Sequence, residues 1–188
     1  EQIASVIFTQ GCNFACPYCH NPSLIPCTKD KQDFIPLDEL LNFIEQRKKL
    51  IDGIVITGGE PTIQDLLPLI SQLKYLNYWV GLETNGTQSV KDIAEVLDYI
   101  AVSPKENTTL SPSVVENADE IRVVNTHSSV EDIIQFNKFD FDYRYISVLE
   151  ENGEFNLSKT IKLLGKVNER GEKKWLINQQ YHKILGIS

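Results

Sequence analysis

Methionine, long apolar runs and an excess of basic charge are all missing from this chain of 188 residues. Without an apolar run of about 20 residues, no segment is typical of a membrane span. The formal net charge of −8 argues against a nucleic-acid surface, because phosphate binding needs clustered Lys and Arg. We therefore expect no membrane and no nucleic-acid partner, and a protein or small molecule instead.

The N-terminus and the composition set further expectations. The sequence begins at Glu1 with no initiator methionine, which indicates that the chain was trimmed. No charged segment followed by an apolar one opens it, so we expect a cytoplasmic protein. The content of 41% hydrophobic and 23% charged residues is ordinary for a globular protein. The length and the lack of a low-complexity linker predict one domain over residues 1–188.

Cysteine is scarce and confined to one segment. Four Cys lie between positions 12 and 27, and none follows. Disulfide frameworks spread their cysteines to join distant segments, so this crowding indicates a metal site. Cys12, Cys16 and Cys19 are spaced so that one tight loop presents three thiolates, and Cys27 is interpreted as a spare thiol.

Two metal centres are compatible with this loop. Three thiolates suit a [4Fe–4S] cubane and leave one iron without a protein sulfur, as the binding of a small chelating molecule requires. Structural zinc is the alternative, because it takes four ligands and often uses closely spaced Cys and His. His20 or Cys27 would then supply the fourth ligand, whereas in a cluster site His20 would pack nearby. Spacing alone leaves both centres open.

Apolar strands alternate with segments of helical periodicity along the chain. We predict strands at 3–9, 53–57, 79–83, 99–102, 120–124 and 143–148. Helices are predicted at 37–50, 66–76, 90–97, 114–117, 130–136 and 157–168. The continuous apolarity of 53–57 predicts burial on both faces of a sheet. The alternation predicts an α/β fold with a parallel sheet, either doubly wound or curved into a partial (β/α)6 barrel.

Polar or Gly-rich motifs follow the first four of these strands. They are Gly11–Cys19, Gly58–Pro61, Glu83–Gly86 and Ser103–Lys105. The C-terminal ends of parallel strands lie at one edge of a sheet, where ligands bind, so the four motifs should form one site. A zinc-binding interaction module would explain the Cys loop but not this alignment.

At these residues the chain resembles the radical S-adenosylmethionine (SAM) superfamily, through Cys12-x3-Cys16-x2-Cys19 with Tyr18 before the last Cys. The resemblance covers most of the chain and implies a partial barrel of the radical SAM type. It also implies a [4Fe–4S] cluster that reductively cleaves SAM to a 5′-deoxyadenosyl radical for hydrogen abstraction. The low potential of this step implies a reductant such as flavodoxin or ferredoxin.

The resemblance assigns further residues to SAM. Gly58, Gly59 and Glu60 stand in the family's GGEP motif, which binds the amino group of the methionine end. Glu83 and Asn85 stand where the family carries an acidic residue followed by TNG, and a carboxylate there would accept hydrogen bonds from ribose hydroxyls. Taken alone, this stretch is an ordinary Asn-Gly turn beside a solvated Glu83.

Cationic and hydroxyl groups follow on the next strands. Ser103 offers a hydroxyl, and Lys105 a charge for the SAM carboxylate, although an isolated Lys is usually a solvated surface residue. Arg122, on the predicted fifth strand, could likewise meet an anionic group. A salt bridge at the rim is an equally good interpretation of Arg122.

The first part of the chain is similar to glycyl-radical-enzyme activases, nearest to the anaerobic ribonucleoside-triphosphate reductase activating proteins. Residues 8–22 and 47–61 carry this similarity. It implies a glycyl radical enzyme as protein substrate, with Ser103 departing from the Asp that is usual there. Because these residues lie nearest the predicted cluster, we favour the activase from the sequence.

The second part is similar to 7-carboxy-7-deazaguanine synthase, which contracts a pterin ring in queuosine biosynthesis. Residues 65–69, 103–105, 118–121 and 175–187 carry this similarity. It implies that Gln180 and His182 line the pterin site, whereas taken alone they are polar residues near a chain end. Against it, His20 and Asn21 replace the family's Asp-Thr, which removes a Mg²⁺ ligand, and Phe8 replaces an expected Arg.

Overall fold

A computed structural model of the chain describes residues 3–27, 34–126, 128–151 and 153–179. Its main element is a sheet of seven parallel strands in the order β1-β2-β3-β4-β5-β6-β9. The strands are β1 Ala4–Thr9, β2 Gly53–Gly58, β3 Trp79–Thr84, β4 Tyr99–Val102, β5 Glu120–Val124, β6 Tyr143–Ser147 and β9 Leu176–Asn178. A short antiparallel hairpin, β7 Glu150–Glu151 and β8 Glu154–Phe155, follows β6.

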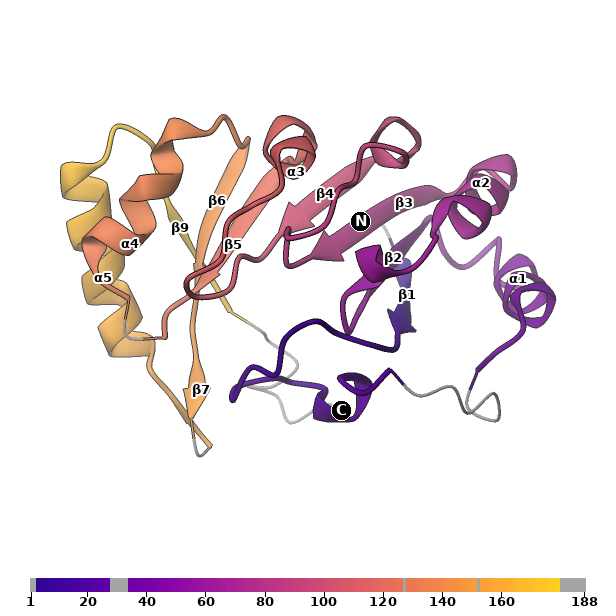
Figure 1. The fold of residues 1–188 in the computed structure, drawn as a ribbon, viewed down its shortest axis with the longest axis horizontal. Helices are drawn as coiled ribbons and strands as arrows, with labels where there is room; N and C mark the ends of the chain where they lie inside the picture. The colour runs from indigo at the N-terminus through magenta and orange to yellow at the C-terminus, as the bar shows by residue number, and fades with distance from the viewer. Residues whose placement is uncertain (1–2, 28–33, 127, 152, 180–188) are drawn as a thin grey trace.

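The strand order decides between the two predicted closures. A doubly wound sheet reverses its strand order at a switch point, whereas here successive parallel strands are always neighbours. The sheet therefore curves in one sense as a partial barrel, with its helices ranged along one side (Figure 1). Within the described residues β1 and β9 form the two edges and do not pair with each other, so the barrel stays open.

Most predicted helices are present with shifted ends. They are α1 Leu37–Glu45, α2 Leu67–Tyr75, α3 Pro112–Asn117, α4 Val130–Ile134 and α5 Leu157–Arg170. Local chemistry explains several ends: Pro112 opens α3 at its first position, where no amide hydrogen is needed. Ser129 and Asp132 form a capping box that starts α4. None of the described helices is long and apolar enough to cross a membrane.

Two predictions about the elements are wrong. The segment 90–97 contains only a 3-10 turn, Ala94–Val96, in place of a helix. The Val90 amide donates to Ser113 Oγ at 3.0 Å, and a segment this short gains little from helix propagation. The sheet also has seven strands where six were predicted, because β9 spans only three residues and shows no pattern of its own.

The two faces of the sheet differ in chemistry. Outward-facing residues of the central strands are fully buried against the helices and form the core, among them Ile54, Ile56, Val80, Ile121 and Ile146. Side chains alternate along a strand, so the intervening residues face the inside of the partial barrel. On β2 these are Val55 and Thr57, which are only partly buried. The expectation of a strand buried on both faces is therefore wrong: the inner face of the sheet is left for the site.

Because the two faces differ, two matched Val→Ala substitutions should lower the free energy of unfolding by different amounts. Val80→Ala removes two methyl groups from a fully buried position and should lower the free energy of unfolding by about 2 kcal/mol. Val6→Ala, on β1 with 49% exposure, should change it by less than about 0.5 kcal/mol. Urea denaturation followed by circular dichroism measures both, and equal losses would contradict this assignment of the core.

Candidate active site

A cavity of about 260 Å³ lies at the C-terminal ends of the strands, on the inner face of the sheet. Every predicted site residue in the described part of the chain lines it. These residues are Cys12, Cys16, Tyr18, Cys19, Gly58, Gly59, Glu60, Glu83, Asn85, Ser103, Lys105 and Arg122. The predicted substrate residues Gln180 and His182 lie outside the described residues.

Backbone hydrogen bonds attach the Cys loop to the end of β2. The Gly59 amide donates to the Thr9 carbonyl at 2.8 Å, and the Glu60 amide donates to the Gly11 carbonyl at 2.7 Å. A Cβ on Gly59 would lie 2.1 Å from the Gly11 oxygen, and Gly58 has a φ of +115°. The two glycines thus allow the Cys loop and the end of β2 to come close together, in addition to any close approach of a ligand.

Glu60 is buried, with 1% exposure, and its carboxylate binds the ends of β2 and β3 together. Oε1 accepts from the Thr62 amide, the Thr62 hydroxyl and the Thr84 hydroxyl at 3.1, 2.5 and 2.7 Å. Oε2 accepts from the Asn85 amide at 2.6 Å. A carboxylate oxygen offers about two acceptor positions, so Oε2 retains capacity for a ligand in the cavity.

Asn85 joins the end of β3 to the Cys loop. Its Nδ2 donates to Asn13 Oδ1 at 2.8 Å, and Asn13 Nδ2 donates to the Thr87 hydroxyl at 2.9 Å. The Thr87 amide and hydroxyl donate to Asn85 Oδ1 at 3.0 and 2.7 Å. Because Asn13 is the neighbour of Cys12, this closed triangle holds the loop that carries the thiols.

The three predicted cluster thiols are free and partly buried. The Phe14 amide donates to Cys12 Sγ at 3.4 Å, and the Cys19 amide donates to the Cys16 carbonyl at 3.0 Å. Burial raises the pKa of the Cys12 thiol, and the Phe14 amide opposes this rise. Hydrogen bonds to sulfur are one means by which proteins tune iron–sulfur clusters, so the donor set fits such a group.

No three His, Cys, Asp or Glu side chains among the described residues are arranged to hold a single metal ion. A cubane differs from a single ion, because each thiolate binds a separate iron and the ligands surround the cluster. His20 lines the cavity. Cys27 is exposed, and a Cβ on Gly11 would lie 3.4 Å from its Sγ.

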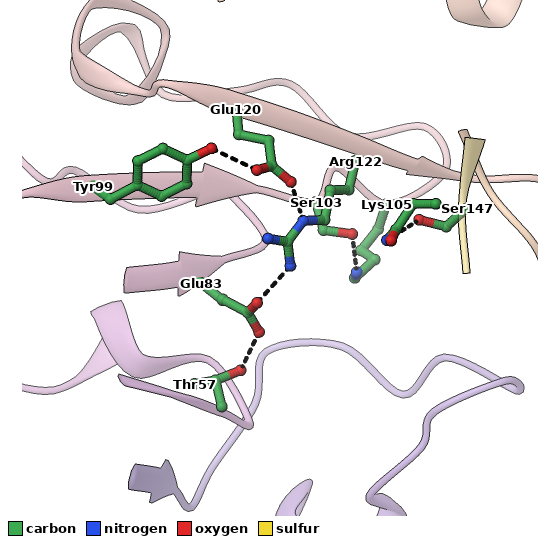
Figure 2. A network of polar contacts seen from close by, with 9 residues as sticks. Thr57, Glu83, Tyr99, Ser103, Lys105, Glu120, Arg122 and Ser147 are labelled. Carbon is green, nitrogen blue, oxygen red and sulfur yellow. Dashed lines mark hydrogen bonds and ion pairs between the residues drawn. The ribbon is translucent and has the colours of Figure 1, made fainter. Parts of the chain in front are cut away.

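Charged groups cross the inner face of the sheet (Figure 2). Lys105 Nζ donates to Ser103 Oγ at 3.1 Å, and burial lowers the pKa of Lys105, against the opposing charges of Cys16 and Glu60. Arg122 is paired with Glu83 and with Glu120. Arg122 therefore forms salt bridges, as the second interpretation of this residue expected.

Sequence reasoning missed the groups at the far edge of the cavity. Ser147 ends β6 and Asn178 ends β9; both line the cavity, and Asn178 Nδ2 donates to Ser147 Oγ at 3.1 Å. Ser147 lies near the end of the predicted strand 143–148. Because the site was expected at the C-terminal ends of the strands, this position could have identified Ser147 as a site residue. Asn178 lay in the segment 175–187 that resembles the synthase, but its strand is too short to recognise from the sequence.

Comparison with known proteins gives the class to which this arrangement belongs. The model of the radical SAM superfamily matches residues 6–139, and the chain belongs to that superfamily. The chain is thus a radical SAM enzyme, and the family implies a [4Fe–4S] cluster and SAM.

Individual relatives divide between two activities. The chain is 36% identical over 185 residues to 7-carboxy-7-deazaguanine synthase of Haemophilus influenzae, covering 94% of this chain and 81% of the relative. It is 33% identical to the synthase of Neisseria meningitidis, with coverage of 94% and 81%. A Methanocaldococcus jannaschii protein named as a glycyl-radical enzyme activating enzyme is 28% identical over 174 residues, with coverage of 86% and 70%.

Solved structures confirm the fold. QueE from Escherichia coli superposes with a TM-score of 0.70 at 23% identity, covering 94% of this chain and 85% of QueE. Streptococcus suis SuiB bound to S-adenosylmethionine superposes with a TM-score of 0.68 at 18% identity, covering 94% of this chain and 50% of SuiB. The predicted α/β partial barrel is therefore correct.

The contact between Gly59 and Gly11 predicts a loss of iron binding. Gly59→Ala places a methyl group against the Gly11 carbonyl and should displace the Cys loop, so that iron and sulfide retained after anaerobic reconstitution fall severalfold. Gly165→Ala is the matched control, because a Cβ there meets nothing within 4 Å. Full iron retention in Gly59→Ala would show that the loop tolerates displacement and would contradict this role of the contact.

Proposed function

We propose that this radical SAM enzyme acts as a 7-carboxy-7-deazaguanine synthase, contracting the ring of 6-carboxytetrahydropterin. The observation that carries the proposal is the 36% identity to the Haemophilus influenzae synthase over 94% of the chain. The sequence favoured the activase because of the residues nearest the cluster. The relatives favour the synthase, since its identity of 36% over 94% of the chain exceeds the 28% over 86% of the activating enzyme.

The described residues support a division of roles in the cavity. Cys12, Cys16 and Cys19 would hold a [4Fe–4S] cluster, which supplies the electron that cleaves SAM. Lys105 and Ser103 would bind the SAM carboxylate, and their contact with each other on the cavity wall supports this role.

Hydrogen-bond acceptors that line the same cavity would complete the SAM site. Oε2 of Glu60 and the backbone at Gly58 and Gly59 would receive the methionine ammonium, which needs acceptors. Glu83 would accept from the ribose hydroxyls. Tyr18 would pack beside the cluster, since it lines the same cavity. A reductant of the flavodoxin or ferredoxin type would supply the electron.

Activation of a glycyl radical enzyme is the second candidate function. The activating enzyme of Methanocaldococcus jannaschii supports it, at 28% identity over 86% of the chain. The substrate would then be a backbone glycine of a protein partner in place of a pterin.

Anaerobic turnover separates the two functions. With SAM, dithionite and 6-carboxytetrahydropterin, we expect 7-carboxy-7-deazaguanine by liquid chromatography and mass spectrometry. A parallel reaction supplies the anaerobic ribonucleotide reductase and monitors its glycyl radical by electron paramagnetic resonance. Absence of the deazaguanine together with a glycyl radical signal would establish the activase and contradict our proposal.

The cysteines predict a second, substrate-independent result. Cys16→Ala removes one cluster thiolate and should reduce production of 5′-deoxyadenosine by at least about 100-fold, while circular dichroism shows a folded chain. Cys27→Ala is the control and should retain both cluster and cleavage, because Cys27 is exposed and does not line the cavity. Retained cleavage in Cys16→Ala would overturn the cluster assignment. Loss of iron in Cys27→Ala would make Cys27 a fourth cluster ligand and contradict the open iron.

A further inference from the structure

A network of polar contacts crosses four neighbouring strands on the inner face of the sheet (Figure 2). Thr57 on β2 donates to Glu83 Oε2 at 2.9 Å, and Arg122 on β5 donates to Glu83 Oε1 at 2.5 Å. The Nε of Arg122 binds Glu120 Oε1. The Tyr99 hydroxyl, on β4, donates to Glu120 Oε2 at 2.5 Å.

The two ends of this network have different surroundings. The side chain of Glu83 is 38% exposed and lines the cavity, whereas that of Glu120 is 8% exposed and does not. Tyr99 also lies outside the cavity lining. Glu120 and Tyr99 therefore act on the site only through Arg122.

Arg122 and Tyr99 both keep their protons in this network. Burial alone would lower the pKa of Arg122, but its hydrogen bonds and the charges of Glu120 and Glu83 outweigh burial and raise it. Burial and the hydrogen bond to Glu120 raise the pKa of Tyr99, so its hydroxyl keeps its proton and donates. One guanidinium then faces two carboxylates, and the unit carries a net negative charge.

This arrangement fixes the orientation of Glu83. Both of its oxygens are held, Oε2 by Thr57 and Oε1 by Arg122. Each oxygen retains an acceptor position that can face the cavity. A vicinal diol donates two hydrogen bonds and matches such a carboxylate, whereas an anionic ligand group would meet the excess negative charge of the unit.

We infer that Glu120 and Tyr99 are positioning residues, which hold Arg122 and through it orient Glu83 toward the ribose hydroxyls of SAM. The inference rests on the SAM site of the proposed function and is independent of the second substrate. In this inference Arg122 supports the Glu83 carboxylate and does not bind an anionic group of the ligand.

Binding of S-adenosylhomocysteine and its 2′- and 3′-deoxy counterparts to the anaerobically reconstituted protein tests this. For the wild-type protein, calorimetry should show about tenfold weaker binding when a hydroxyl that reaches Glu83 is absent. Tyr99→Phe and Glu120→Gln should weaken binding of S-adenosylhomocysteine severalfold. They should barely change binding of the deoxy ligand that lacks the hydroxyl facing Glu83. The preference for the hydroxyl should therefore shrink in both variants.

Tyr75→Phe serves as the matched control, because Tyr75 is 81% exposed and should leave all dissociation constants unchanged. If Glu120→Gln does not fold, Tyr99→Phe decides, since it removes a single hydroxyl. Equal weakening of all three ligands would show a merely structural effect and overturn the inference, as would full retention of the hydroxyl preference. A cluster-loaded wild-type protein that bound none of the ligands would instead overturn the SAM site itself.

Discussion

Main-chain contact between the segment after β1 and the segment after β2 determines where the Cys loop lies. The Glu60 amide binds the Gly11 carbonyl at 2.7 Å, and no Cβ fits on Gly59 beside it. Because backbone atoms make this contact, the loop is registered against the sheet edge by the parallel pairing of β1 and β2. A site that needs three thiols around one cavity depends on such registration, since a displaced loop would separate the thiols from the groups on β3, β4 and β5.

Several residues that line the cavity also hold the protein together. Glu60 accepts four hydrogen bonds from Thr62, Thr84 and Asn85, and the Asn85 amide group is linked to the Cys loop through Asn13. The inner face of the sheet thus carries a hydrogen-bonded polar layer, while the outer face carries the apolar core under the helices. Buried polar groups cost free energy unless they are paired, and here protein partners meet that requirement before any cofactor binds.

The sequence predicted the strands β1 to β6, the parallel sheet and the gathering of four motifs at one edge, because each rests on local patterning and on the geometry of parallel strands. It failed at 90–97, where a tertiary contact to Ser113 replaced a helix, and at β9, whose three residues form a strand only by pairing with β6. The contacts from Arg122 to Glu83 and from Tyr99 to Glu120 were equally out of reach, since each joins two strands whose register is a property of the sheet. Our preference for the synthase over the activase rests on its higher identity over most of the chain, which local motifs do not contain.

The central claim is that three thiolates on one registered loop leave a single iron open to SAM. Electron paramagnetic resonance of the reduced, anaerobically reconstituted protein tests it most directly, before and after addition of SAM labelled at its amino nitrogen and carboxylate oxygens. The account predicts a [4Fe–4S]⁺ signal that changes on addition of SAM, with hyperfine coupling to both labels in double-resonance spectra. A colourless protein holding stoichiometric zinc, or a cluster signal unaffected by SAM, would contradict it.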